Sequence, residues 1–357
     1  MTPRSPVGTY WDPSRDETLV CRQIRDETPD VRTFVLSPPQ PRLFDYRPGQ
    51  FMTFEIPVGG MVHTRCYTLS SSPTRPHRVS ITVKRTPGGP VSNWLHDHFR
   101  VGDRLNAIGP MGEFTCDEEG DRDLLLLSAG SGITPLMSMA RAHHDLGDRR
   151  DVVFVQSART SVDVIFADEI AMMARGHTGL RAATICEDAA GGWNGFTGRL
   201  SPSMLSLIAP DFREREVFVC GPTGFMDAVR MMMAEAGFDM GRYHEESFVF
   251  AALSAAEQQE AEGDAPPASG RTYKVEFTRS RRTIEAPEDT SILTAAMRAG
   301  MRLPSSCTQG VCGTCKSKLV SGQVQMNHAG GIRQREIDQG MILICCSRPI
   351  SDLVIER

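Results

Sequence analysis

The stretch Pro304-Ser-Ser-Cys307-Thr-Gln-Gly-Val-Cys312-Gly-Thr-Cys315 places three cysteines in one loop, and a fourth, Cys345, follows after a long gap. This C-x4-C-x2-C spacing with one distant cysteine is the arrangement that holds a plant-type [2Fe–2S] cluster. Such a loop must wrap closely around inorganic sulfide. Gly310 and Gly313 suit that requirement, because residues without a Cβ let backbone N–H groups turn toward sulfur. The sequence therefore predicts an iron–sulfur centre with four ligands, namely Cys307, Cys312, Cys315 and Cys345.

Two alternatives bear on this centre. Zinc sites favour two close pairs of ligands, whereas the second half here is a single distant residue, so the spacing favours iron–sulfur over zinc. Cys345 and Cys346 are neighbours, so the fourth ligand has to be chosen between them. We choose Cys345, because the apolar run 341–344 has the pattern of a strand that delivers Cys345 to the loop. Cys346 would then be a spectator thiol.

Composition bounds the class of protein. The chain has 357 residues, which suggests two or three domains. A formal net charge of −5 gives no reason to expect a nucleic-acid partner. No apolar run reaches the roughly 18 residues that a membrane helix needs, so no membrane association is expected. The N-terminus lacks the apolar core of a signal peptide. Ten cysteines in a chain of this length are too few for a secreted scaffold held together by disulfides, so we expect a cytoplasmic protein.

The first half of the chain reads as an all-β region. Residues 1–15 are rich in Pro, Ser, Arg and Asp and are expected to form a flexible N-terminus. Residues 16–118 contain short alternating runs separated by Pro and Gly, for example at 33–36, 50–56 and 78–84. Many short strands at this spacing predict an antiparallel barrel or sandwich, and of the two we expect the β-barrel.

Residues 119–250 have a different pattern of apolar residues. The continuous apolar run 123–128 is typical of a strand buried on both faces, and a glycine turn and a helix starting near Pro135 follow it. This alternation of strand and helix continues and predicts a parallel, doubly wound α/β domain. Further strands are expected at 152–156, 180–186 and 217–220, and helices at 167–174 and 226–236.

The last third contains a linker and a small domain. Residues 251–270 are small, acidic and proline-containing, and so predict a linker with little to bury. In residues 271–357 we expect a hairpin of strands at 273–277 and 282–285, then a helix at 291–299 with Thr290 as its N-cap and Gly300 past its end. The cluster loop follows, so this region is predicted to be an α+β, β-grasp ferredoxin domain.

A possible flavin motif ends one of the β-like runs. It reads Arg65-Cys-Tyr67-Thr68-Leu-Ser70. A tyrosine ring can pack on an isoalloxazine, a hydroxyl can bond a ring nitrogen, and an arginine can hold phosphate through two parallel hydrogen bonds. Taken alone, the motif fits an ordinary barrel strand equally well. Two further features strengthen the flavin interpretation. The β-like run 81–84 ends in polar residues, and the glycines at 88–89 lead into the start of a helix, where free backbone N–H groups attract phosphate.

The order of these segments resembles the ferredoxin–NADP reductase superfamily. The resemblance implies that Arg65, Tyr67 and Thr68 bind FAD, with FMN as the less favoured flavin. Thr68 stands where the family usually has serine, a change that keeps the hydroxyl. The resemblance also implies flavin contacts from Ser70, Thr82, Val83 and Lys84, and phosphate contacts from Gly89, Pro90, Val91 and Ser92.

A possible nicotinamide motif joins the apolar run to the next helix and reads Gly130-Ser-Gly132-Ile-Thr134-Pro135. Its glycines permit a tight turn and the approach of a pyrophosphate to a helix N-terminus, where Pro135 is also well suited. The third glycine of the dinucleotide fingerprint is absent, so the motif alone is equally a structural turn. The run S-A-G-x-G-I-T-P is, however, characteristic of the same superfamily.

Three further candidates concern the same cofactors. Cys220-Gly221-Pro222 resembles the family's turn that approaches the nicotinamide ring, with Cys220 beside the path of the hydride. Phe248 ends a segment that in relatives lies close to the flavin. Arg159 follows the second strand, where no acid is present to select NAD through its ribose, and it suits a 2′-phosphate, a ribose or a pyrophosphate. We expect NADH, with NADPH left open, because reductases with a C-terminal ferredoxin mostly use NADH.

Apart from its N-terminus and linker, the whole chain resembles the reductase components of Rieske-type oxygenases, including those of N-demethylating monooxygenases that act on glycine betaine or stachydrine. The resemblance implies an electron path from NADH through FAD to the [2Fe–2S] cluster and on to a terminal oxygenase. A flavin is needed between the other two because it accepts an electron pair and releases single electrons. The chain contains no C-x-H pair of a Rieske centre, so the oxygenase must be a separate chain.

Other interpretations of the function stay open at this point. A hybrid-cluster protein or a di-iron epoxidase of CoA esters is an alternative electron acceptor. A zinc-stabilised, non-catalytic scaffold is an alternative of a different class.

Overall fold

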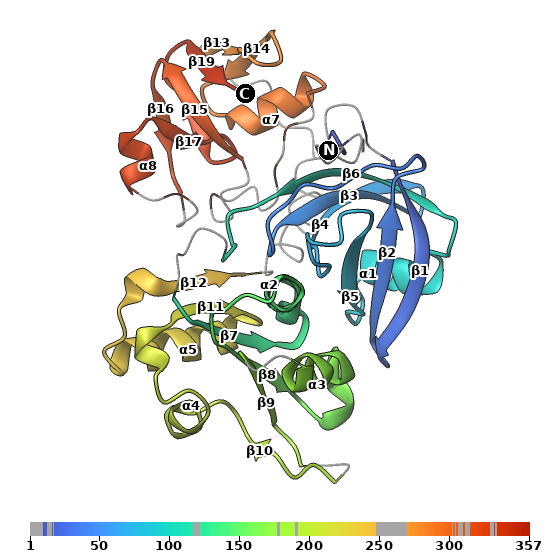
Figure 1. Ribbon diagram of the computed structural model, residues 1–357. Coiled ribbons are helices and arrows are strands. Elements are labelled where there is room, and N and C mark those ends of the chain that lie inside the picture. Colours follow the sequence, from blue (N-terminus) through green and yellow to red (C-terminus); the bar gives the residue numbers. More distant parts are fainter. Residues whose placement is uncertain are drawn as a thin grey trace, which may run out of the picture. The chain divides into compact units, whose positions relative to one another are not determined.

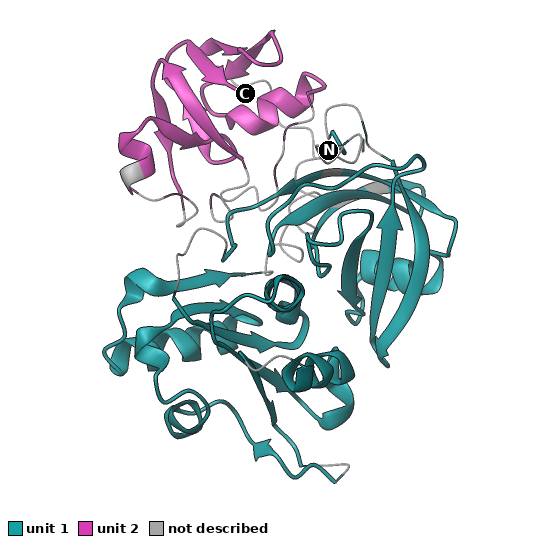
Figure 2. Ribbon diagram, viewed as in Figure 1, with its two compact units in different colours: residues 1–248 teal, residues 249–357 magenta. Residues whose placement is uncertain are grey.

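The computed structural model describes residues 10–12, 16, 18–116, 122–176, 179–189, 192–247, 270–301, 303, 305, 310, 315–328, 332 and 334–357. The chain divides into two compact units, residues 1–248 and 249–357, which Figure 2 distinguishes by colour. The first unit contains a β-barrel and an α/β domain, and the second contains a small mixed sheet. Cys307, Cys312, Phe248 and most of the predicted linker lie outside the described residues. No helix in the described part of the chain is long and apolar enough to cross a membrane.

Residues 18–111 form six strands in one antiparallel sheet with the order β4-β3-β6-β1-β2-β5 (Figure 1). The two end strands meet where Leu69 bridges Ile81, which closes the sheet into a barrel. The predicted antiparallel barrel is therefore confirmed. Its strands are β1 (Thr18–Thr28), β2 (Val31–Ser37), β3 (Phe51–Val58), β4 (Met61–Thr68), β5 (Val79–Lys84) and β6 (Arg104–Met111).

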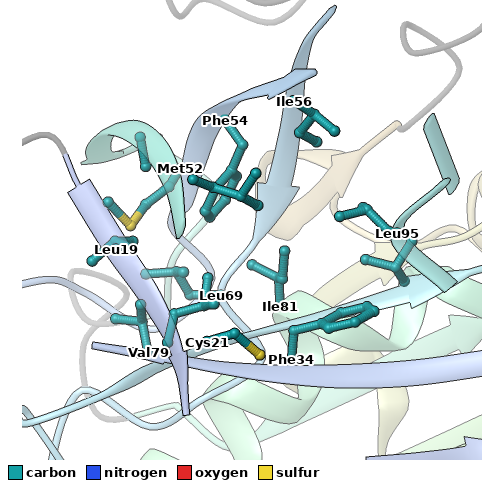
Figure 3. Close-up of a cluster of buried hydrophobic side chains, with 14 of the residues drawn as sticks. Leu19, Cys21, Phe34, Met52, Phe54, Ile56, Leu69, Val79, Ile81 and Leu95 are labelled. Carbon is teal, nitrogen blue, oxygen red and sulfur yellow. The ribbon is translucent and has the colours of Figure 1, made fainter. Parts of the chain in front are cut away.

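The alternation of side chains along the strands builds the barrel core. On β5, Val79 and Ile81 point inward and are buried together with the aromatic rings of Phe34 and Phe54 (Figure 3). Val83, two residues further along the strand, belongs to the same cluster. Leu95 of helix α1 (Pro90–Asp97) joins the same cluster. Burial of each such side chain contributes about 1.5–3 kcal/mol relative to exposure, so this cluster is the main source of the barrel's stability.

The α/β domain has a six-stranded sheet with the order β10-β9-β8-β7-β11-β12, in which all neighbouring strands are parallel. Chain order runs outward from β7 in one direction and from β11 in the other, so the topological switch point lies between β7 and β11. A parallel, doubly wound sheet was predicted, and it is confirmed. Its strands are β7 (Leu124–Ala129), β8 (Val152–Ala158), β9 (Leu180–Cys186), β10 (Phe196–Thr197), β11 (Glu216–Cys220) and β12 (Tyr243–Glu246).

The leucine run of β7 faces two layers of helices, which explains why it is continuously apolar. Leu124 and Leu126 pack in one cluster with residues of α2 (Ile133–Leu146) and α3 (Ala167–Gly176). Leu125 and Leu127 pack in another cluster with residues of α4 (Pro202–Ile208) and α5 (Thr223–Glu235) (Figure 1). The sheet is therefore covered on both faces.

The second unit is a mixed sheet with the order β14-β13-β19-β15-β17 and a separate two-stranded sheet, β16-β18. Strand β13 pairs with β14 as the predicted antiparallel hairpin and with β19 in parallel. This is the predicted α+β, β-grasp arrangement, with its own buried core. Its elements are β13 (Thr272–Phe277), β14 (Arg282–Pro287), α7 (Ile292–Arg298), β15 (Lys316–Ser321), β16 (Val324–Met326), α8 (Gln334–Asp338), β17 (Met341–Leu343), β18 (Ser347–Pro349) and β19 (Leu353–Glu356).

One cap in this unit differs from the prediction. The N-cap of α7 is Ser291, whose side chain accepts a hydrogen bond from the backbone N–H of Thr294, so the assignment of Thr290 as the cap was wrong. Both residues carry the hydroxyl that a cap needs, and composition alone cannot separate neighbours. Gly300 does lie past the end of the helix, with φ +73°.

Candidate functional site

The predicted flavin strand is β4, at the end of which the barrel closes. Arg65 and Thr68 are buried, with 7% and 5% of their surface exposed. Tyr67 lies two residues from Arg65, on the same side of the strand, and its ring centroid lies 6.1 Å from that of Phe54. Burial raises the pKa of Tyr67, with Arg65 opposing the rise, so the phenol is a neutral donor at physiological pH. A cation, an aromatic ring and hydroxyls at one strand end fit a flavin dinucleotide.

The hydroxyls of Ser70 and Thr82 are hydrogen-bonded to each other across the closure of the barrel. The distance between their oxygens is 2.9 Å, and Thr82 also meets the hydroxyl of Thr33 at 2.8 Å. All three residues are at most 6% exposed. These hydroxyls, which the resemblance assigned to the flavin in the case of Ser70 and Thr82, brace the closure of the barrel.

The next two residues of β5 are also engaged within the protein. The side chain of Val83 belongs to the barrel core, and its carbonyl oxygen lies 2.9 Å from Nε2 of His96. The ammonium group of Lys84 lies 3.0 Å from the carboxylate of Asp30. Both residues thus lie beside the point where the barrel closes. The side chain of Val83 packs in the core, and the side chain of Lys84 forms an ion pair with Asp30.

The predicted phosphate segment forms the start of α1. Gly88 has φ +72°, and Gly89 is the N-cap, followed by Pro90 in the first turn. Because glycine has no side chain to cap the helix, the positive end of α1 is available to an anion. Ser92 accepts a hydrogen bond from the backbone N–H of Thr86 at 3.1 Å, which fixes the preceding loop. Val91 packs into the barrel core.

The predicted nicotinamide turn lies at the topological switch point of the α/β sheet. Gly130 has φ +53° and makes the sharp turn after β7. A Cβ on Gly132 would lie only 2.3 Å from the carbonyl carbon of Cys220 and 2.4 Å from the backbone nitrogen of Gly221. The turns that follow β7 and β11 are therefore in direct contact. A crevice at the carboxyl ends of such strands is where doubly wound sheets bind their ligands.

Three buried polar atoms lie at or near this edge of the sheet without a hydrogen-bond partner among the described residues. They are Oε1 of Gln156, Oγ of Ser157 and Oε2 of Glu246. Gln156 and Ser157 lie near the carboxyl end of β8, and Glu246 is the last residue of β12. Unsatisfied buried groups are rare in folded proteins and call for an unseen partner. A dinucleotide rich in amide, hydroxyl and phosphate groups fits this edge.

Glu246 lies opposite Cys220 in the pairing of β11 with β12. Burial raises the pKa of Glu246 to about 8. Burial, and to a smaller extent the neighbouring carboxyl of Glu246, raises the pKa of Cys220 well above its ordinary value. At neutral pH this edge of the sheet therefore contains a covered, uncharged thiol and a mostly protonated carboxyl group, an environment suited to a neutral nicotinamide ring. Sequence reasoning missed Glu246, because only the strand register pairs it with Cys220.

The remaining nicotinamide candidates have local roles in the fold. Thr134 donates its hydroxyl to the carbonyl oxygen of Ser131 at 3.2 Å, and Pro135 is the third residue of α2. Pro222 is the N-cap of α5. Arg159 is two-thirds exposed, and its guanidinium lies 3.1 Å from Asp163 and 3.8 Å from Asp30. Asp30 was not predicted as a partner of Arg159, because it comes from the barrel, far away in the sequence, and Asp163, four residues on, was overlooked.

Two of the predicted cluster cysteines lie in the described part of the second unit. Cys315 immediately precedes β15 and Cys345 follows β17, and these strands pair so that Lys316 faces Leu343. This register brings both cysteines to the same end of the sheet, where both are buried, at 1% and 7% exposure. A Cβ on Gly310, which has φ +74°, would lie 2.6 Å from Sγ of Cys346. Two buried thiols at one end of the sheet, with a glycine required at position 310 nearby, fit the predicted cluster.

Comparison with known proteins matches three family models to these regions in order. Residues 19–116 match the oxidoreductase FAD-binding domain, residues 126–231 the oxidoreductase NAD-binding domain, and residues 275–349 the 2Fe-2S iron-sulfur cluster binding domain. The match to the last of these sets aside the zinc interpretation of the cysteine motif.

Two curated relatives align with this chain from end to end. The sequence is 42% identical to the glycine betaine monooxygenase reductase subunit of Pseudomonas aeruginosa over 99% of this chain and 98% of that protein. It is 39% identical to the stachydrine N-demethylase reductase subunit of Rhizobium meliloti, with 98% of each chain covered. Among solved structures, phthalate dioxygenase reductase is similar over 97% of this chain and 100% of that chain, with 26% identity and a TM-score of 0.59.

The order of the three regions explains what the molecule does. A bound flavin accepts two electrons together from a reduced nicotinamide and gives them up one at a time to an iron–sulfur cluster. The protein's part is to hold these groups in order. The chain belongs to the family of oxygenase reductases that carry electrons from NADH through FAD to a [2Fe–2S] ferredoxin domain within one polypeptide.

Proposed function

We propose that this protein delivers its electrons to a separate Rieske-type monooxygenase that removes an N-methyl group from a quaternary or tertiary amine. The observation that carries the proposal is the end-to-end similarity to reductase subunits of a glycine betaine monooxygenase and of a stachydrine demethylase, at 42% and 39% identity. Both names refer to N-methylated, zwitterionic substrates. The natural setting would be the cytoplasm, where NADH is regenerated.

A second acceptor class is favoured by a different relative. The reductase component of the 3-ketosteroid-9-alpha-monooxygenase of Mycobacterium tuberculosis is 35% identical over 94% of each chain. The hybrid-cluster protein and the di-iron epoxidase of CoA esters are further alternatives. The lower identity of the steroid relative makes an apolar substrate the weaker candidate.

Reconstitution with defined oxygenases tests this proposal. The purified reductase is mixed with NADH, oxygen and either a glycine betaine monooxygenase or a ketosteroid 9α-monooxygenase, each with its substrate. We expect about one formaldehyde per NADH with the first oxygenase, and little coupled turnover with the second. Coupled hydroxylation of the steroid without formaldehyde release from the betaine would contradict the proposal.

We further propose Cys307, Cys312, Cys315 and Cys345 as the cluster ligands. The supporting observation is the β15–β17 register, which brings Cys315 and Cys345 to one end of the sheet. Cys345→Ser is expected to lower the iron and acid-labile sulfide content of the purified protein, whereas the neighbouring Cys346→Ser keeps both. Loss of the cluster from Cys346→Ser alone would reverse the assignment.

For the nucleotide we propose NADH over NADPH. Two carboxylates, Asp30 and Asp163, lie within 3.8 Å of Arg159. They compensate the charge of Arg159, the cation that the sequence offered to a 2′-phosphate, and they repel that phosphate. The double variant Asp30→Asn, Asp163→Asn is therefore expected to raise kcat/KM for NADPH relative to NADH. An NADPH preference in the unmodified protein would contradict this assignment.

A further inference from the structure

One face of helix α2 holds a segment of the flavin barrel. Ser138, Arg141 and Asp145 occur at spacings of three and four residues, so they share a face of the helix. We call this set the clamp face, and residues 70–75 the barrel segment. Every member of the clamp face is hydrogen-bonded to the barrel segment.

The three contacts run in order along the helix. The hydroxyl of Ser138 donates to the carbonyl oxygen of Ser71 at 2.6 Å, and Nη1 of Arg141 donates to the carbonyl oxygen of Ser70. One turn further, the carboxylate of Asp145 accepts two hydrogen bonds from Arg75, at 2.6 and 2.9 Å, and a third from the hydroxyl of Thr74. The helix and the segment are thus joined over their whole common length.

Arg141 is the buried centre of this face. It is 3% exposed, and its guanidinium makes two hydrogen bonds to the carboxylate of Glu169, at 2.8 and 2.6 Å. The same guanidinium lies 4.7 Å from the ring centroid of Phe166, a residue held at φ +59°. Bulky residues rarely adopt a positive φ, and such conformations persist where the surrounding structure imposes them. Contacts within the α/β domain therefore orient the guanidinium of Arg141, in addition to its hydrogen bond to the barrel.

The two joined elements each begin at a cofactor site. Helix α2 starts directly after the Gly130–Gly132 turn at the switch point. The barrel segment starts two residues after Thr68, and the backbone N–H of Ser70 is tied to the carbonyl oxygen of Ser80 at 2.8 Å. A helix of 14 residues is a rigid rod about 20 Å long, so the clamp face transmits the position of one turn to the other.

We propose that Arg141 is a positioning residue for hydride transfer: through the clamp face it sets how closely the nicotinamide site approaches the flavin site. Such transfers require near-contact of donor and acceptor, and a displacement of about 1 Å can lower the rate about a hundredfold. The proposal rests on hydride transfer between NADH and FAD and is independent of the oxygenase that receives the electrons.

The chain offers a matched control for the loss of a buried arginine. Arg215 is 2% exposed, pairs with Asp151 and Asp211, and donates to the carbonyl oxygen of Leu124 at 3.1 Å. It lies in the same α/β domain, before β11, at the amino ends of the strands and therefore at the opposite strand ends from the Gly130–Gly132 turn. Arg215→Ala therefore removes comparable interactions without touching the barrel.

The experiment compares full-length, reconstituted Arg141→Ala, Arg141→Lys, Arg215→Ala and unmodified protein. Stopped-flow absorbance gives the rate of flavin reduction at saturating NADH under anaerobic conditions. Equilibrium titration gives the dissociation constant of NAD⁺, and flavin content and Tm are measured on the same samples. Hydrogen–deuterium exchange of the peptide that covers the barrel segment reports, independently of turnover, whether the clamp has opened.

We expect Arg141→Ala to reduce its flavin about tenfold or more slowly, with kcat falling and KM nearly unchanged. Its flavin content and affinity for NAD⁺ should change by less than about threefold, and exchange in the barrel segment should be faster. Arg141→Lys should recover part of the rate, because lysine can still donate to the carbonyl oxygen of Ser70. Arg215→Ala should lower Tm and leave the reduction rate within about twofold.

Two outcomes would overturn the proposal. One is an Arg141→Ala protein that reduces flavin at the unmodified rate while its barrel segment exchanges faster. The other is an equal loss of rate in Arg215→Ala, which would make the effect one of stability. If Arg141→Ala does not fold, Ser138→Ala decides instead, since it removes only the hydrogen bond to Ser71. A reduction rate unchanged in that variant, with faster exchange in the segment, would equally overturn it.

Discussion

Gly132 has no room for a side chain. A Cβ there would lie 2.3 Å from both the carbonyl carbon and the carbonyl oxygen of Cys220, so backbone would have to move. Gly130, two residues earlier, has open space around its Cβ direction but has φ +53°. One turn therefore contains a glycine required by packing and a glycine required by conformation.

These two glycines are expected to respond differently to alanine. Gly130→Ala should lower the free energy of unfolding by about 1–2 kcal/mol, the cost of a left-handed conformation for an L-residue. Gly132→Ala should cost about 3 kcal/mol or more and weaken NADH binding, because it separates the turns after β7 and β11. Urea unfolding and NAD⁺ titration of both variants measure this. Equal losses in the two variants would show that the turns are not in contact.

The carboxyl of Glu246 makes stability depend on pH. Its pKa is raised by burial from an ordinary 4.5 to about 8, so the folded state binds this proton more tightly than the unfolded state does. The contribution to stability is therefore complete below pH 4.5 and is lost as pH rises through about 8. Between these values the slope is at most about 1.4 kcal/mol per pH unit.

Glu246→Gln should remove this dependence. Without added nucleotide, the Tm of the unmodified protein should fall more between pH 6 and pH 8.5 than the Tm of the variant does. Glu245→Gln is the matched control on the same strand: its carboxylate pairs with Arg230, and this variant should keep the unmodified decline. Parallel pH profiles for the unmodified protein and Glu246→Gln would contradict the assignment.

At the scale of elements, the strands that close the barrel are joined by a chain of buried hydroxyls, from Thr33 through Thr82 to Ser70. Thr82→Val removes the central hydroxyl, so the hydroxyl of Thr33 loses its hydrogen bond to residue 82. We expect a loss of about 1–3 kcal/mol in the free energy of unfolding. Adding Thr33→Val should restore part of it, since two apolar groups of similar shape leave no unpaired hydroxyl at that contact. A double-mutant cycle with urea unfolding measures the coupling, and strict additivity would contradict it.

Sequence patterns predicted most elements because each has a local cause. The leucine run of β7 indicates a strand buried on both faces, and the alternation of β5 indicates a strand with one face in the core. Gly237 follows the end of α5 and has φ +72°, the left-handed conformation common for a glycine at that position. The α7 cap was misplaced by one residue, because Thr290 and Ser291 offer the same hydroxyl.

What sequence alone did not show depends on register and on distant partners. The pairing of Glu246 with Cys220, the hydrogen bond of Ser70 with Thr82, and the ion pair of Asp30 with Arg159 each join residues that are not neighbours in the chain. Motif spacing carries no information on which neighbour satisfies a polar group. The α2 clamp face was missed for the same reason, since its partners lie about 70 residues away.

At the scale of the whole molecule, the two units have separate hydrophobic cores. A chain ending at residue 248 is therefore expected to fold and bind FAD. It should reduce ferricyanide, which accepts electrons from the flavin, at a rate within about twofold of the intact protein. Its reduction of cytochrome c through the cluster should be lost.

Adding residues 249–357 as a separate polypeptide provides the control. Cytochrome c reduction should return only as the concentration of that polypeptide approaches about a millimolar, the order of effective concentration that a covalent connection between two units supplies. A truncated protein that loses its FAD, or that reduces cytochrome c as fast as the intact chain, would contradict the independence of the units.

The sulfur of Cys220 is fully covered, and its pKa is raised well above the ordinary value. Peroxide and alkylating agents attack the thiolate, so a covered, protonated thiol reacts with them slowly. Reduced flavins that meet oxygen release peroxide. Burial of this sulfur should therefore protect the turn after β11 from oxidation.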